Sequence, residues 1–174
     1  MAVVGENLLK HTYWTDEYVQ SIKSADTANR FYGDWAKSLT GNILIKKVEE
    51  TNLYRIQSLV NNSKGYGIVQ DVRNLKANTD YTFSAEVGDS FFIGFSMGSN
   101  MWPSKPEGFV VEEGFAKYTF NTGSGTTLRI FIYANKGLGY VSYMNFLKLE
   151  EGTEATDWVP APEEYESVFG GVVT

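Results

Sequence analysis

Side chains that could carry out catalysis are few in this sequence and form no recognisable set. His11 is the only histidine, so a histidine metal site or a Ser-His-Asp triad would depend on that one residue. The sequence has no glycine-rich phosphate loop and no G-x-S-x-G turn. The remaining candidates are adjacent acids, at Glu49/Glu50, Glu112/Glu113, Glu150/Glu151 and Glu163/Glu164. Adjacent acids point apart, whereas a glycosidase needs two carboxyl groups facing each other across about 5 to 10 Å. We therefore expect a protein that is not an enzyme, with glycoside hydrolysis as one alternative.

Aromatic residues are the second group whose chemistry indicates a function. Four Trp, eleven Tyr and eleven Phe exceed what a core of this size needs, and a Trp or Tyr on a surface offers a flat face that suits a sugar ring. Several lie in an irregular stretch, residues 7–41, and one lies in the polar loop 98–104. We predict a ligand-binding surface drawn from Trp14, Tyr32, Trp35, Arg55, Gln57, Trp102 and Tyr133. The alternative is structural: the aromatic rings would pack the core edge or cap the fold, and the polar side chains would form a solvated face.

Composition and charge restrict the classes of partner. The formal net charge is −6, but residues 1–149 hold 15 basic and 14 acidic side chains, while residues 150–174 hold seven acids and no base. A nearly neutral body lacks the basic stripe that neutralises phosphates, so we expect no nucleic-acid partner. No apolar run approaches the roughly 18 to 20 residues of a membrane helix, and the N-terminus lacks signal-peptide features, so we expect no membrane association. The sequence contains no cysteine, so packing rather than disulfides must hold the fold together.

Eight segments after Gly41 have the composition and spacing of β-strands. They are residues 42–49, 53–61, 66–74, 80–88, 91–97, 115–121, 127–134 and 139–149, separated by turns rich in Asn, Gly and Ser. Alternation assigns Phe83, Ala85 and Val87 to the core, and likewise Leu128, Ile130 and Ile132. Helix is confined to short candidates at residues 16–24 and 163–168. The pattern predicts an all-β fold, an antiparallel jelly-roll sandwich of about eight to ten strands.

The C-terminal region is predicted to close this fold. The strand that ends at Leu149 is followed by an abrupt acidic stop and then by Trp158 and the prolines Pro160 and Pro162. We expect Trp158 to fold back as a lid over the core edge, with a structural role. Residues 1–162 would then form one module, and residues 163–174 an acidic connector or tail.

Several motifs in this chain resemble a known family. They are Asn7-Leu8-Leu9, Gln70-Asp71-Val72, the run from Leu75 to Ser84, and the ending Leu147-Lys148-Leu149-Glu150-Glu151-Gly152 with Ala155-Thr156-Asp157-Trp158. Together they resemble the jelly-roll carbohydrate-binding modules of families four and nine, over residues 5 to about 162. The ending is especially similar to modules in tail and baseplate proteins of bacteriophages that infect Gram-positive bacteria.

This resemblance implies a function, a location and partners. Such modules bind glycans without cleaving them, so it implies recognition of host cell-wall polysaccharide by a virion protein, with other phage tail proteins and further copies of itself as partners. A bacterial origin would imply an extracellular protein instead. The alternative is a structural tail module with no glycan ligand. The family often has an Asp in its last strand that helps to hold structural calcium. This chain has Asn145 there, a weaker ligand for a hard cation, so no metal is expected and Asn145 is the one calcium candidate.

Overall fold

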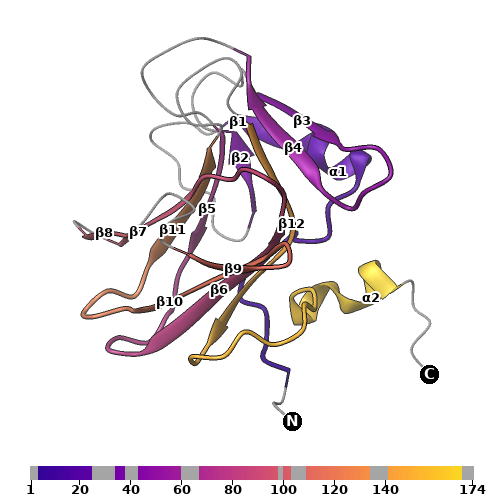
Figure 1. The fold of residues 1–174 in the computed structure, drawn as a ribbon. Coiled ribbons are helices and arrows are strands. Elements are labelled where there is room, and N and C mark those ends of the chain that lie inside the picture. Colours follow the sequence, from indigo (N-terminus) through magenta and orange to yellow (C-terminus); the bar gives the residue numbers. More distant parts are fainter. Residues whose placement is uncertain are drawn as a thin grey trace.

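Two six-stranded β-sheets form the body of the computed structural model, which describes residues 4–24, 34–37, 43–59, 67–97, 100–102, 109–133 and 141–169 (Figure 1). Sheet A has the strand order β1 (Lys23–Ser24), β2 (Ala36–Lys37), β5 (Gly67–Val72), β11 (Leu128–Tyr133), β7 (Ile93–Met97) and β8 (Asn100–Trp102). Sheet B has the order β3 (Ile43–Lys47), β4 (Tyr54–Ser58), β12 (Val141–Glu151), β6 (Asp80–Val87), β10 (Phe115–Asn121) and β9 (Val110–Glu112). Strands pair antiparallel except for the two-residue pair β1–β2. The predicted antiparallel jelly-roll sandwich is confirmed.

Each of the eight predicted strands is present, with boundaries within a few residues of those expected. The helical candidates correspond to α1 (Asp16–Ser21) and to the short pair η2 (Pro162–Glu164) and α2 (Tyr165–Phe169). Asn7-Leu8-Leu9 forms no assigned strand, although the Leu8 N–H donates to the Leu149 carbonyl (2.8 Å). The described helices include none that is long and apolar enough to cross a membrane.

The core lies between the sheets and follows the predicted alternation. Phe83 of β6 and Ile130 of β11 are completely buried, and the Phe83 ring packs against Phe95 of β7 with ring centroids 5.3 Å apart. Phe109 and Phe120 extend this aromatic cluster toward β9 and β10. Because inward residues come from both sheets, burial of these rings is what holds the two layers together.

A bulge in β12 decides which of its residues face outward. The pairing with β6 shifts register between Asn145 and Lys148, and Phe146 takes a positive φ of 53°. Met144 lies in the core before the bulge, and Leu147 lies in the core after it. The extra residue therefore reverses the parity and places Phe146 and Lys148 on the outer face of sheet B.

Asn145 holds this bulge through both ends of its amide. Its Nδ2 donates to the carbonyl of Asn52 (2.6 Å), and its Oδ1 accepts from the N–H of Phe146 (2.8 Å). Calcium takes six to eight oxygen ligands, and the described residues include no group of three or more His, Cys, Asp or Glu side chains that could hold a metal ion. Both ends of the Asn145 amide are already hydrogen-bonded within the chain, and a calcium role for Asn145 stays a prediction.

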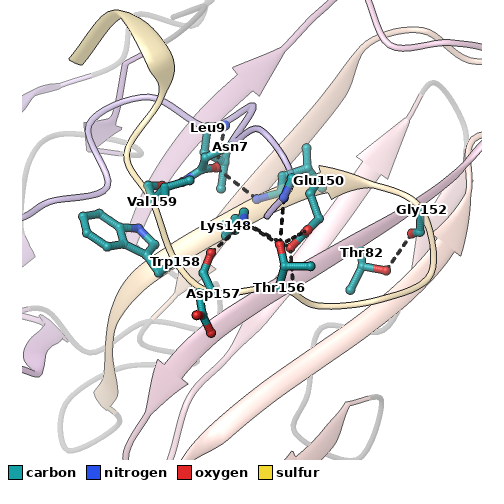
Figure 2. Close-up of polar contacts among 12 residues, drawn as sticks. Asn7, Leu9, Thr82, Lys148, Glu150, Gly152, Thr156, Asp157, Trp158 and Val159 are labelled. Carbon is teal, nitrogen blue, oxygen red and sulfur yellow. Dashed lines mark hydrogen bonds and ion pairs between the residues drawn. The ribbon is translucent and has the colours of Figure 1, made fainter. Parts of the chain in front are cut away.

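The chain after β12 folds back over the outer face of sheet B, on the side of β12 away from β5 and β11 (Figure 1). It covers Lys148 and Glu150, whose side chains are 0% and 2% exposed and whose Nζ and Oε2 atoms lie 3.6 Å apart. Lys148 Nζ donates to Thr156 Oγ1 (2.8 Å) and to the Asp157 carbonyl (2.7 Å) (Figure 2). Burial lowers the pKa of Lys148, and the charge of Glu150 opposes that change. Such a pair is tolerated in the interior only because its remaining donors and acceptors are hydrogen-bonded.

Asn7 links the N-terminal segment to the same region. It is completely buried, and its Nδ2 donates to the carbonyls of Leu147 (3.0 Å) and Val159 (2.9 Å). Its Oδ1 accepts from the N–H groups of Leu9 (3.0 Å) and Leu149 (3.1 Å). We call this network of Asn7, Lys148, Glu150 and Thr156 the polar clasp (Figure 2). The sequence motifs near the two ends of the chain thus supply the residues of the polar clasp.

Candidate functional site

Two of the predicted ligand-binding residues, Trp14 and Trp35, lie in the core. They are 4% and 1% exposed, and their rings meet edge to face with centroids 6.0 Å apart. Trp14 also packs against Tyr54 (5.9 Å), and Trp35 Nε1 donates to the carbonyl of His11 (3.0 Å). A ring with so little exposed area has no face for a sugar. The structural alternative, in which residues 7–41 pack the core, applies to both tryptophans.

Of the other predicted aromatic residues, only Tyr133 has a side chain that the structure describes. Tyr32 lies outside the described residues, and so does the side chain of Trp102, whose backbone belongs to β8. Tyr133 is partly exposed and packs against Phe131 (centroids 4.9 Å) on the outer face of sheet A. Phe131 and Val69 beneath it are 8% and 7% exposed. A ligand role for Tyr32, Trp102 and Tyr133 stays a prediction.

Arg55 and Gln57 project from the opposite sheet. They are partly buried, and β4 sets Arg55 opposite Tyr143 and Gln57 opposite Val141 of β12. The core residues Tyr54 and Ile56 alternate with them, as predicted. Arg55 Nε is buried and has no hydrogen-bond partner among the described residues. The two polar residues therefore share the outer face of sheet B, and their role in binding stays a prediction.

A groove lies further along this same outer face of sheet B. Its volume is about 510 Å³. Three aromatic rings and two carboxylates are among its lining residues, which are Ser84, Glu86, Val87, Glu113, Gly114, Phe115, Phe146 and Trp158. We call it the aromatic groove. All of its residues lie in the described part of the chain.

Three separate elements bring the rings of this groove together. Phe115 begins β10 opposite Glu86 of β6, and it is 41% exposed. Phe146 points outward because of the bulge in β12. Trp158 comes from the segment that covers the polar clasp, and its ring meets Phe146 edge to face with centroids 5.0 Å apart.

The turn between β9 and β10 forms one wall of the groove. Glu113 and Gly114 have φ angles of 50° and 78°, a left-handed conformation that gives a tight reversal and suits glycine at the second position. The Gly114 carbonyl accepts from the N–H of Val87 (2.8 Å). This contact fixes the turn against β6 and places Glu113 beside the aromatic rings.

Trp158 packs against the N-terminal segment and also lines the groove. Its Nε1 donates to Thr12 Oγ1 (3.2 Å), and its ring stacks on Tyr13 at 6.0 Å. It nevertheless remains partly exposed and lines the groove. It therefore packs on the outer face of sheet B, rather than over the core edge as the sequence led us to expect.

A second cavity, of about 580 Å³, differs in chemistry. It lies between the N-terminal segment and the turn after β5, and its charged lining residues have mixed signs, namely Glu6, Lys10, Asp71, Arg73, Lys76 and Glu151. Lys76 and Glu151 pair across it (3.1 Å), and the hydroxyl of Tyr81 accepts from the Lys76 N–H (2.9 Å). Its one aromatic residue, Tyr81, is buried, so no ring face is available for stacking.

Sequence reasoning missed the lining of the aromatic groove. The signal for Phe115 was present, because Ala116 and Phe120 occupy the inward parity of its strand and leave Phe115 facing outward. Phe146 gave no such signal, because the bulge reverses the parity on which such a prediction depends. Glu86 and Glu113 are far apart in sequence and meet only through the pairing of β6 with β10.

Comparisons with known proteins extend the fold assignment. No protein-family model matches the sequence, and no curated protein matches it. Among solved structures, an apo cyclase from Fischerella sp. matches with a TM-score of 0.52 and 15% identity, covering 89% of this chain and all of that one. The CBM22-1 xylan-binding domain of Paenibacillus barcinonensis Xyn10C matches with a TM-score of 0.49 and 8% identity, covering 89% of this chain and all of that domain. At such identities a likeness concerns the fold alone.

Proposed function

We propose that this protein is a non-catalytic carbohydrate-binding module that holds a glycan in the aromatic groove. One observation carries the proposal: Phe115, Phe146 and Trp158 come from three elements and line one groove together with polar side chains. A sugar ring has an apolar face of C–H groups and a rim of hydroxyls. Aromatic rings match the first, and the Ser84 hydroxyl and the Glu86 and Glu113 carboxylates match the second.

The groove supports modest affinity at a single site. A hydrogen bond between a sugar hydroxyl and a charged group contributes about 1.5 to 3 kcal/mol at best, and exposed carboxylates give less because water competes. Phe115 is 41% exposed, so part of the stacking surface is already in contact with water. Several linked copies would raise the apparent affinity by making later contacts intramolecular.

The proposed setting is the tail of a bacteriophage, where the module would recognise the cell-wall polysaccharide of a Gram-positive host. This proposal is supported by the resemblance of the ending, Leu147–Gly152 with Ala155–Trp158, to phage tail modules. Those motif residues build the polar clasp, so they relate the chain to such modules through its fold. A virion location, contacts with other tail proteins and assembly of several copies belong to the same proposal.

Titration of purified cell-wall polysaccharides tests the binding proposal. The panel should include several Gram-positive hosts, with heat measured on binding to the wild type and to Phe115→Ala. Phe169→Ala is the matched control, because Phe169 is a similarly exposed ring (47%) outside the groove. We expect Phe115→Ala to weaken binding and Phe169→Ala to leave it unchanged. Failure of the wild type to bind any polysaccharide would favour a structural tail module. Equal binding by both variants would remove the groove from the proposal.

Hydrolysis is the second candidate, because two carboxylates, Glu86 and Glu113, line the same groove. A glycosidase requires one such group as acid and the other as base or nucleophile. Prolonged incubation with any polysaccharide that binds, followed by measurement of new reducing ends, separates the two candidates. We expect no release. Release that is lost in Glu86→Gln and Glu113→Gln would establish the enzyme.

A further inference from the structure

The aromatic groove contains negative charge that its described surroundings do not pair. No ion pair or hydrogen bond to the side chain of Glu86 or Glu113 occurs within the part of the chain that the structure describes. Two other carboxylates behave differently: that of Glu150 accepts from Thr156, and that of Glu164 accepts from the N–H of His11. Glu86 and Glu113 thus differ from the acids whose hydrogen bonds hold the fold together.

Two described lysines on this face lie beside the groove and are not among its lining residues. Lys117 of β10 and Lys148 of β12 flank Ser84 from its two sides. Lys148 is buried and donates to Thr156 and Asp157. Lys117 is exposed and is not among the groove's lining residues. Among the described residues, the lining of the groove therefore offers a ligand two carboxylates and three aromatic rings, and no cation.

Aromatic rings combined with carboxylates select for a positively charged group. The negative face of an aromatic ring attracts an ammonium ion, with Trp the strongest of the side chains. A carboxylate pairs with the same group, whereas it repels a phosphate or a uronic acid. A neutral sugar would leave the two carboxylates of the groove without a partner of opposite charge.

We infer that the groove recognises an amino sugar through its free, protonated amine. This inference rests on the proposed glycan binding and deepens it by naming the class of sugar. The amine would lie against the ring of Trp158 or Phe146 and pair with Glu86 or Glu113. N-acetylation of that amine removes the positive charge and adds bulk, so it should abolish the preference.

A matched pair of oligosaccharides tests this inference. The glucosamine hexamer and the N-acetylglucosamine hexamer share one backbone and linkage and differ in the amine. Binding of each is measured in mildly acidic buffer, where the amine is protonated, to the wild type, Glu86→Gln, Glu113→Gln and the control Glu154→Gln, which removes an exposed carboxylate outside the groove. Hexalysine serves as a cation without sugar rings and controls for attraction to the acidic chain.

We expect the glucosamine hexamer to bind about tenfold more tightly than its acetylated partner, consistent with one charge-assisted contact. Glu86→Gln or Glu113→Gln should reduce that ratio, Glu154→Gln should not, and added salt should lower it. Hexalysine should bind more weakly than the glucosamine hexamer. Equal binding of the two hexamers, a preference for the acetylated one, or hexalysine binding as tightly would overturn the inference and leave glycan binding standing.

A polysaccharide that binds in the host panel provides a second measurement. Its affinity is compared before and after chemical N-acetylation of its free amines. A loss on acetylation supports the inference, and unchanged affinity overturns it. If neither hexamer nor any polysaccharide of the panel binds, the proposed function itself fails, and the inference fails with it.

Discussion

Glu150 and Thr156, six residues apart, are joined by two hydrogen bonds: the Thr156 hydroxyl and N–H both donate to the Glu150 carboxylate, at 2.5 and 3.1 Å. The same hydroxyl accepts from Lys148 Nζ (2.8 Å). One threonine oxygen thus connects two buried charges of opposite sign. This bridge explains why an acidic stop can be followed by a chain that folds back rather than leaving the sheet.

Thr156→Ala should destabilise the protein strongly. The substitution removes an acceptor from Lys148 and a donor from Glu150 while both remain buried, and groups left in that state cost about 1 to 3 kcal/mol or more each. Urea denaturation should show a loss of about 2 to 4 kcal/mol in the free energy of unfolding. Thr153→Ala, at an exposed position of the same segment, is the control and should change little. Equal stability of the two variants would mean that Thr156 does not bridge the pair.

Trp35→Ala should affect stability, and binding only through folding. Its ring is 1% exposed and packs edge to face on Trp14, so removal leaves a large cavity that typically costs about 3 to 5 kcal/mol. Thermal unfolding followed by circular dichroism measures the loss. If the variant kept its melting temperature but lost glycan binding, Trp35 would belong to the ligand surface after all.

Trp158→Ala should show both effects, each of moderate size. Because the ring is partly exposed, its removal should cost about 1 to 3 kcal/mol, less than a fully buried aromatic. Binding of a glycan should also weaken, since the ring lines the aromatic groove. Trp158→Phe should recover part of both losses. Glycan affinity must be measured at a temperature where the variant is folded. Unchanged affinity there would mean that Trp158 has a structural role only.

Tyr54→Phe should alter the stability at alkaline pH. Burial, together with the charge of Asp16, raises the pKa of Tyr54 from 10.0 to about 12. A folded-state pKa above the unfolded one gives a stabilising contribution that is complete below about pH 10 and is lost as the pH rises toward 12. Removing the hydroxyl should flatten the fall in unfolding free energy between these pH values. Parallel pH profiles for the two proteins in that range would contradict the assignment.

Truncation after Pro162 tests the tail. Residues 163–169 meet the body through a few polar contacts: Lys10 pairs with the exposed Glu163, and the His11 N–H donates to the partly buried Glu164 (2.9 Å). Exposed ion pairs contribute about 0 to 1 kcal/mol, so removing the tail should barely lower the melting temperature. A loss as large as that expected for Thr156→Ala would make the tail part of the sandwich.

The strands could be predicted from the sequence because alternation and turn residues are local signals. β9 was not predicted because Val110–Glu112 is short and all three of its residues are exposed, so its sequence shows no alternation between an inward and an outward face. Trp14 and Trp35 were assigned to a surface because they lie in an irregular stretch, yet contacts with Tyr54 and the His11 carbonyl, distant in sequence, turn them inward. The groove depends on a bulge and on the pairing of β6 with β10, neither of which alternation encodes.

The bonds of Asn7 to Leu147 and Val159 also constrain when the protein can fold. These partners lie 140 and 152 residues apart in sequence, and β12 sits between β4 and β6 in the middle of its sheet. During synthesis, β12 can pair with β4 and β6 only after nearly the whole sandwich has left the ribosome. Until then, the edges of β4 and β6 that pair with β12 stay unpaired. We expect nascent chains stalled before Val141 to be cleaved readily by protease, and chains released through Ala161 to become resistant. We therefore expect this module to fold late in synthesis, once its last strand, β12, has left the ribosome.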